Sequence, residues 1–281
     1  RLTPRHQAVP LETLDPLTRG SMFHSVQATA LRAMQAKGLL PVTSTNLATA
    51  QVILDGALDE VSANLKDTLC PAIPRVWDEN VAAMRTDLRT WLTRMAENPE
   101  WVPRHFELGI GMTVRPDMDP GSYPQTPTVG AGYKVHGVID LLEQHAQRHT
   151  WRVTDHKTGQ NRTQPGRVTH GGRYLQPTIY ALAYTAVSQH TVESSRLSFC
   201  TAAGRFTEHP VGSAELNSVF ALEPLQIVNH AFETGWMLRA PDDGACTYCD
   251  YVQVCGPGQE EHVRRKALGN LQDLIKLRGL P

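Results

Sequence analysis

The chain contains no apolar run that could cross a membrane, since no window approaches the roughly 18 uncharged apolar residues that such a helix needs. The first ten residues also lack the apolar stretch of a signal peptide. Aromatic residues are few, at 6%, but 41% apolar and 20% charged residues are ordinary for a globular protein and exclude disordered or fibrous chains. We therefore expect a soluble, cytoplasmic protein with no membrane partner. Because the first residue is not Met, we also expect a fragment of a longer chain.

The chain also lacks a large excess of positive or negative charge. The formal net charge is -1, so the whole chain lacks the basic excess that is typical of nucleic-acid-binding proteins. The segment 156–192 is different, because it contains no Asp or Glu but four cations. Its arginines, Arg162, Arg167 and Arg173, are therefore candidates for contacting DNA phosphates. The same pattern is equally typical of a solvated loop.

Hydrophobic periodicity and turn residues indicate an α/β protein of 281 residues. The expected helices cover 15–38, 44–69, 74–96, 173–189 and 214–236, and the expected strands cover 106–114, 133–142, 150–157, 196–201 and 206–211. We expect one integrated domain with three parts. They are a helical region over 1–100, an α/β core over 101–240, and a Cys-rich segment with a C-terminal helix over 241–281.

The two strands predicted over 133–142 and 150–157 are joined by a short polar turn and should form an antiparallel hairpin. Asp155 and Lys157 lie two residues apart on one strand, so their side chains leave the same face of the sheet. Pairing can bring Asp140 beside Asp155, and two converging carboxylates repel each other unless a cation joins them. Such ligands suit Mg or Mn, and with Lys157 they indicate metal-assisted attack of water on a phosphodiester. An Asp-x-Lys pair alone is more typical of a surface ion pair.

Ordered motifs extend this hypothesis along most of the chain. They are Leu14-Asp-Pro-Leu-Thr-Arg-Gly20-Ser-Met-Phe-His24, Phe106-Glu107-Leu-Gly109, Gly137-Val-Ile-Asp140, Asp155-His-Lys157-Thr-Gly159 and Gln176-x-x-x-Tyr180. The set resembles the motifs of RecB-like nucleases in the PD-(D/E)XK superfamily. The resemblance implies a restriction-endonuclease-like core, in which a central mixed sheet is flanked by helices.

The resemblance also assigns roles to single residues. It implies that the metal ligands are His24, Asp140, Asp155 and the backbone carbonyl of His156, and that Lys157 is the catalytic lysine. Glu107 resembles an acidic residue that many members carry before the Gly-x-x-Asp strand, which makes it a further candidate ligand. Gln176 and Tyr180 lie four apart on one helix face, where they could position the lysine or the DNA backbone. Taken alone, His24 is better explained as a capped or core histidine. Gln176 and Tyr180 alone would likewise need no function, since a helix can simply pack a tyrosine against the sheet.

Cysteine is scarce, and three of the five cysteines fall close together near the C-terminus, as Cys246, Cys249 and Cys255. Such clustering indicates a metal site rather than disulfides. Three C-terminal cysteines resemble those of AddB-type subunits, where a fourth cysteine precedes the histidine helix and completes a 4Fe-4S cluster. We expect the fourth ligand upstream of this chain; zinc or no metal at all are the alternatives. Cys70 or Cys200 could in principle substitute for the fourth ligand, but both are expected to pack as small buried side chains.

The resemblance implies a Mg- or Mn-dependent deoxyribonuclease. We expect exonuclease-type cleavage of DNA ends or single strands during DNA repair or recombination, with a helicase domain or subunit as partner. One alternative is a CRISPR adaptation-type nuclease. Another is a DNA-binding scaffold of a helicase-nuclease that has lost cleavage.

Overall fold

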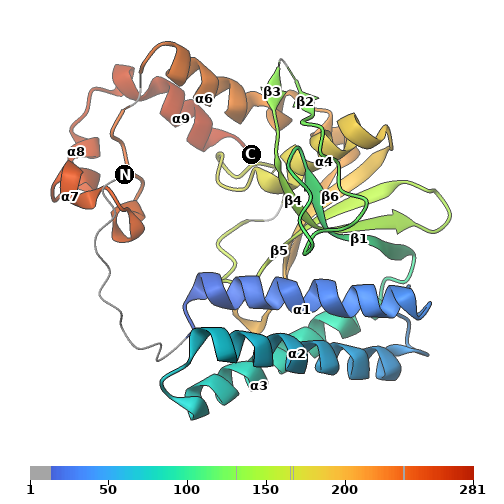
Figure 1. The fold of residues 1–281 in the computed structure, drawn as a ribbon. Coiled ribbons are helices and arrows are strands. Elements are labelled where there is room, and N and C mark those ends of the chain that lie inside the picture. Colours follow the sequence, from blue (N-terminus) through green and yellow to red (C-terminus); the bar gives the residue numbers. More distant parts are fainter. Residues whose placement is uncertain (1–13, 131, 165, 167, 237) are drawn as a thin grey trace.

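The computed structural model describes residues 14–130, 132–164, 166, 168–236 and 238–281. Along the chain, three long helices precede an α/β region, and short helices follow (Figure 1). The elements are α1 (Pro16–Ala36), α2 (Leu47–Leu69), α3 (Pro74–Ala96), β1 (Trp101–Ile110), β2 (Thr128–Val129), β3 (Tyr133–Lys134), β4 (Gly137–His145), β5 (Trp151–Lys157), α4 (Gln176–Ser188), β6 (Val192–Phe199), η1 (Ala202–Gly204), β7 (Glu208–Gly212), α5 (Ser213–Leu216), η2 (Val219–Ala221), α6 (Glu223–Glu233), η3 (Ala245–Tyr248), α7 (Val252–Cys255), α8 (Gln259–Arg264), η4 (Leu268–Leu271) and α9 (Gln272–Gly279).

The central sheet has five strands in the order β1-β4-β5-β6-β7. The pairs β1–β4, β4–β5 and β6–β7 are antiparallel, whereas β5 and β6 are parallel and are connected through α4. The predicted hairpin is the β4–β5 pair, in which Leu141 lies opposite Thr154. The predicted fold class, a mixed sheet flanked by helices, is therefore confirmed.

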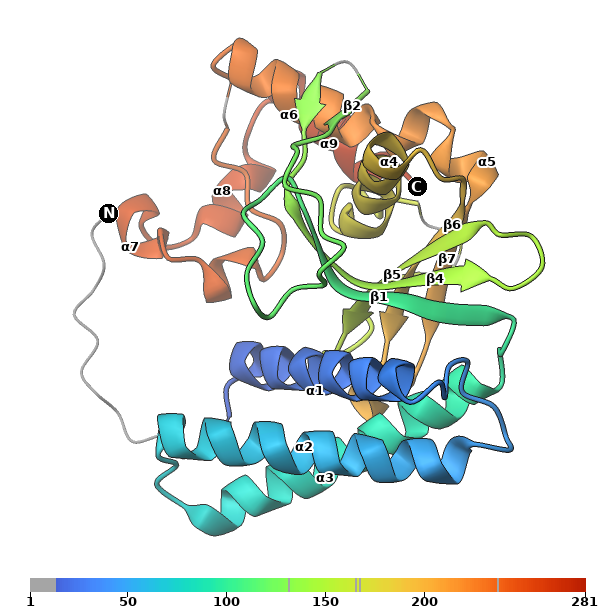
Figure 2. The same ribbon diagram turned by 45° about the vertical axis from the view of Figure 1, so that its right-hand side comes forward.

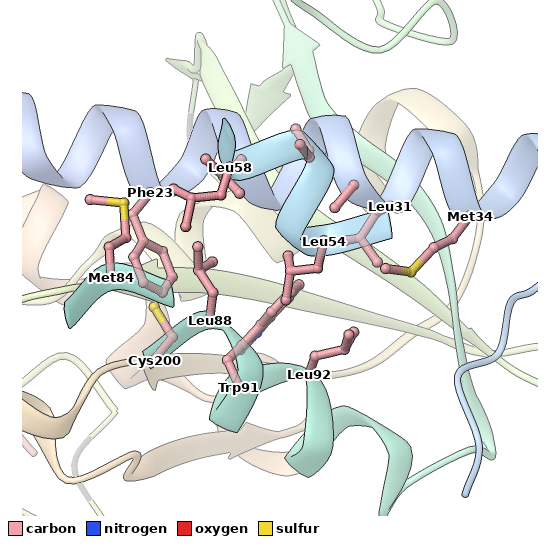
Figure 3. Packing of buried hydrophobic residues seen from close by; sticks show 14 of the residues in the cluster. Phe23, Leu31, Met34, Leu54, Leu58, Met84, Leu88, Trp91, Leu92 and Cys200 are labelled. Atoms are coloured by element: carbon pink, nitrogen blue, oxygen red, sulfur yellow. The ribbon is translucent and has the colours of Figure 1, made fainter. Parts of the chain in front are cut away.

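Helices cover both faces of the sheet. The layer of α1, α2 and α3 lies on one face, and α4 lies on the other (Figures 1 and 2). Each face has its own hydrophobic core. The core on the helical side contains Phe23, Leu88 and Trp91, as Figure 3 shows. The core on the α4 side contains Leu108, Ile139 and Tyr184. No helix in the part of the chain described is both long and apolar enough to cross a membrane.

The first helix begins where the sequence indicates. Asp15 is its N-cap, and its Oδ1 accepts hydrogen bonds of 3.0 Å from the backbone N–H groups of Leu17 and Thr18. Pro16 occupies the first helical position, where the missing N–H costs no hydrogen bond. This cap fixes the start of the helix that carries His24 to the sheet.

Three predicted elements differ most from the structure. The first strand runs over Trp101–Ile110 rather than 106–114, and it ends just before Gly111, which has a φ of 69°. The expected strand 133–142 is divided, because Tyr133–Lys134 pairs with the short strand β2 and only the part from Gly137 joins the main sheet. The expected helix 214–236 is broken into α5, η2 and α6, since Pro224 has no N–H and fits only the first turn of a new helix.

Candidate metal centre

Three side chains from three different elements converge at one end of the β4–β5 hairpin. His24 comes from α1, Glu107 from β1 and Asp140 from β4, and one ligand atom of each lies within 4.8 Å of the other two. His24 Nδ1 is 3.5 Å from Asp140 Oδ1. The backbone N–H of His156 donates to Asp140 Oδ2 at 2.6 Å, which fixes the carboxylate against β5. Glu107, the least certain ligand in the sequence, thus lies with His24 and Asp140.

Asp155 adjoins this group from the neighbouring strand. The β4–β5 pairing ends with Leu141 opposite Thr154, and Asp140 and Asp155 are the next residues in the same register. Asp155 is 3% exposed, and the ion pair between its Oδ2 and Lys157 Nζ measures 2.7 Å. The two acids and the lysine are therefore neighbours, which is the spatial relation that the hairpin predicts.

Lys157 is held from two sides. Besides its ion pair with Asp155, its Nζ donates to Gln176 Oε1 at 2.8 Å. Tyr180, one turn further along α4, packs against the start of β4, where a Cβ on Gly137 would lie only 2.7 Å from the tyrosine hydroxyl. Gly137 therefore permits the close approach of α4 to the site. The positions agree with the predicted positioning role for Gln176 and Tyr180, which stays a prediction.

The acids of the site differ in how readily they ionise. Burial opposes ionisation of Asp140, but the hydrogen bond and charge of His24 lower the pKa of that carboxyl below its usual range. Burial and the neighbouring Asp140 raise the pKa of Asp155 to about 6 and that of Glu107 to about 7. Burial favours neutral His24, yet Asp140 raises the pKa of the imidazole. A cation among these groups would relieve the repulsion between the carboxylates.

The donor set fits a divalent cation. Carboxylate oxygens and one imidazole are ligands that such ions accept in proteins. Asp155 Oδ2 is buried, and among the residues described no donor meets it with hydrogen-bond geometry, although the Lys157 ion pair is close. His24, Glu107, Asp140 and Asp155 would hold the ion, and the His156 carbonyl stays a predicted ligand.

Trp91, which belongs to no sequence motif of the site, supports the strand behind it. Its ring meets the buried His156 edge-on, with the ring centroids 5.8 Å apart. Burial lowers the pKa of His156 to about 3, so this imidazole is neutral. Only the buried face of an amphipathic helix could have indicated Trp91.

Trp91 also borders a polar pocket of about 300 Å³ beneath α3. Glu143, Arg152 and Arg196 line this pocket, which is distinct from the metal centre.

The three arginines proposed for DNA binding have different surroundings. Arg162 is exposed in the loop after β5. Arg173 is also exposed but forms an ion pair with Asp242, so a carboxylate already neutralises this cation. Arg167 lies outside the described residues. The electrostatic argument for phosphate binding is therefore stronger for Arg162 than for Arg173.

The C-terminal cysteines lie in the short helical segment that follows α6. Cys246 is in η3, Cys249 follows it directly, and Cys255 ends α7. Desolvation, Glu260 and the other two thiols raise the pKa of Cys246. Within the described ranges, however, the three sulfur atoms do not form a group within 4.8 Å of one another. The three cysteines are thus near one another in the chain, but their sulfur atoms do not converge on one metal position.

The other two cysteines lie away from this cluster. Cys200 is 2% exposed and packs in the helical-side core, as predicted. Cys70 is exposed at the C-terminal end of α2, so the prediction that it is buried is wrong. It adopts a left-handed backbone conformation there, with a φ of 46°, as residues that end helices often do.

Comparison with known proteins supplies the family. The sequence model of the PD-(D/E)XK nuclease superfamily matches residues 1–256, which is most of the 281-residue chain. No curated protein sequence matches it. The mixed sheet flanked by helices, with acidic residues at the end of the β4–β5 hairpin, is consistent with the fold of that superfamily. The chain therefore belongs to the PD-(D/E)XK nuclease superfamily.

Proposed function

We propose that this chain is a Mg- or Mn-dependent deoxyribonuclease. The observation that carries the proposal is the convergence of His24, Glu107 and Asp140 beside the Asp155–Lys157 ion pair. Structural ion pairs are common, but this group combines a lysine with two carboxylates whose pKa values are raised, those of Glu107 and Asp155. Membership of a nuclease superfamily supports hydrolysis of phosphodiesters as the reaction.

Each side chain has a physical role in this proposal. A bound divalent cation supplies Lewis acidity toward the phosphodiester. His24 and the carboxylates hold that cation, and His156 N–H keeps Asp140 oriented toward it. Lys157, whose Nζ is fixed between Asp155 and Gln176, holds the attacking water or stabilises the charge that develops on the phosphate.

The biological setting that we propose is DNA repair or recombination. The order of the motifs from His24 to Tyr180 supports a RecB-like enzyme that acts as part of a helicase-nuclease. It also supports exonuclease-type cleavage at DNA ends or in single strands. The two alternatives, a CRISPR adaptation-type nuclease and an inactive scaffold, share the same fold. The first predicts different substrates, and the second predicts no cleavage.

Cleavage assays test the proposal directly. We expect purified protein to cut labelled single-stranded or duplex DNA when Mg²⁺ or Mn²⁺ is present and to stop when EDTA removes the ion. Asp140→Ala should abolish cutting, because the remaining ligands cannot hold the cation as tightly. Equal cutting by Asp140→Ala and wild type would mean that a contaminant cleaves the DNA. The inactive scaffold would then be the better interpretation.

We further propose that Cys246, Cys249 and Cys255 bind a 4Fe-4S cluster or zinc together with a fourth ligand. Closely spaced cysteines are typical ligands of both metals, which supports the proposal. Protein prepared without oxygen should be brown and contain iron, or be colourless and contain zinc. Replacement of Cys249 with serine should lower that metal content. Protein that contains neither metal would contradict the proposal.

A further inference from the structure

We propose that Arg32 and Asp119 are positioning residues that hold Glu107 toward the cation. This inference rests on the proposed metal site and concerns how the fold builds one of its ligands. Neither residue belongs to the ordered motifs, and neither is among the candidate ligands. Both contact the backbone of β1 around Glu107, a position at which that strand is irregular.

The irregularity lies at Glu107 itself. Its φ is 56°, whereas residues other than glycine rarely adopt positive φ. The residues on either side pair normally with β4, as Phe106 with Leu141 and Leu108 with Ile139. Phe106 nevertheless packs in the helical-side core and Leu108 in the core on the α4 side, although residues two apart in a regular strand share a face.

The strand therefore turns over at Glu107. This local twist is what allows the side chain between two buried apolar residues to lie with His24 and Asp140. Such a conformation persists only when the surrounding structure determines it from several directions. Arg32 and Asp119 bond the backbone at this position.

Arg32 fixes one side of the turn. Its Nη2 donates to the backbone carbonyl of Phe106 and to that of Asp117, both at 2.9 Å. One guanidinium thus joins β1 to the loop that runs along its free edge. Because Arg32 and His24 are both on α1, the same helix provides one metal ligand and the contact that shapes another.

Asp119 fixes the other side. Its backbone N–H donates to the carbonyl of Glu107 at 3.0 Å, and its Oδ2 accepts from the N–H of Phe106 at 3.0 Å. Its Oδ1 accepts from the N–H of Gly121 at 2.8 Å, which holds the loop itself. Asp119 is 5% exposed, so these bonds are shielded from water. Together, Arg32 and Asp119 bond the backbone directly before and after the Glu107 Cα.

The test is a double-mutant cycle read by Mn²⁺ binding, without any cleavage assay. Mn²⁺ is titrated into metal-free protein and the free ion is measured by electron paramagnetic resonance. We expect Arg32→Ala and Asp119→Asn each to raise the Kd for Mn²⁺ by about 10- to 100-fold, the range seen when groups that orient metal ligands are removed. Glu107→Gln should cause a similar loss. In the Glu107→Gln background, Arg32→Ala and Asp119→Asn should have almost no further effect.

Gln35→Ala is the matched control. Gln35 also lies on α1 and donates to a β1 backbone carbonyl, that of Arg104 at 3.0 Å, but this contact is at the register shift between Pro103 and His105 and not at Glu107. Its removal should leave the Kd for Mn²⁺ unchanged. If Arg32→Ala does not fold, as far-ultraviolet circular dichroism would reveal, the Asp119→Asn cycle decides the question.

Three results would overturn the inference. The first is a Kd for Mn²⁺ that stays unchanged in Arg32→Ala and Asp119→Asn. The second is a loss of Mn²⁺ affinity that is equally large when these changes are made in the Glu107→Gln background. The third is wild-type protein that binds no Mn²⁺. The last result would also end the proposed metal-dependent function. Protein that binds Mn²⁺ with the expected coupling but cuts no DNA would contradict the nuclease proposal alone and support the positioning roles.

Discussion

Lys157→Ala should cut DNA about 10²- to 10³-fold more slowly than wild type, a loss typical of removing one group that stabilises transition-state charge. Lys157 is not a metal ligand in the proposed site, so Mn²⁺ binding should persist. The lysine lowers the pKa of Asp155, which is about 6 with Lys157 in place, so both proteins are compared at about pH 8. Single-turnover cleavage and Mn²⁺ titration at that pH measure the two effects separately.

Lys66→Ala provides the comparison for this variant. Lys66 forms an exposed ion pair with Asp78, at 3.4 Å, on the far helices of the helical layer. Its removal should change neither cleavage nor metal binding. A Lys157→Ala protein that cuts at the wild-type rate would show that the lysine has no part in the reaction.

The second large effect is expected on stability. Glu143 is 1% exposed, and its carboxylate accepts hydrogen bonds from Arg152, Arg196 and Thr154 at distances between 2.8 and 3.1 Å. Removal of one partner from a buried ion-pair network leaves charges without compensation. Glu143→Ala should therefore lower the free energy of unfolding by about 3–5 kcal/mol. Urea unfolding followed by circular dichroism measures the change.

The pH dependence of the same network has a defined sign. Burial alone would raise the pKa of Glu143, but Arg196 and Arg152 lower it below its unfolded value. Its contribution is therefore fully present above the unfolded pKa of about 4.3 and is lost as the pH falls through the folded pKa. The difference in stability between wild type and Glu143→Ala should shrink in acid.

An exposed pair serves as the reference for this prediction. Glu79→Ala removes the carboxylate that Arg75 contacts at 3.0 Å in an exposed position on α3, and it should cost no more than about 1 kcal/mol. Equal losses for Glu79→Ala and Glu143→Ala would mean that the buried network contributes no more than a surface contact.

Much of this molecule follows from short-range sequence patterns. Asp15 and Pro16 specify the start of α1, because an acceptor side chain and a residue without N–H fit a helix terminus. The alternation of strand residues places Asp155 and Lys157 on one face, and the short turn makes an antiparallel partner of the strand that carries Asp140. The fold class and the position of the hairpin acids were therefore predictable without coordinates.

Two element boundaries differ for local reasons, because Pro224 breaks the predicted helix 214–236 and Thr128–Val129 pairs with part of the predicted strand 133–142. Other features depend on contacts between residues that are distant in the chain. The ion pair of Arg173 with Asp242 neutralises a charge that seemed free for phosphate. No local sequence pattern indicates an ion-pair partner that lies so far along the chain.

The sequence by itself determined which residues can ionise, which faces they share and which elements bear them. Only the tertiary structure decided that Glu107 joins His24 and Asp140. A strand pattern predicts regular alternation, whereas the turn at Glu107 exists because Arg32 and Asp119 bond the backbone around it. Hydrogen bonds between segments far apart in sequence can stabilise a backbone conformation that local preference disfavours.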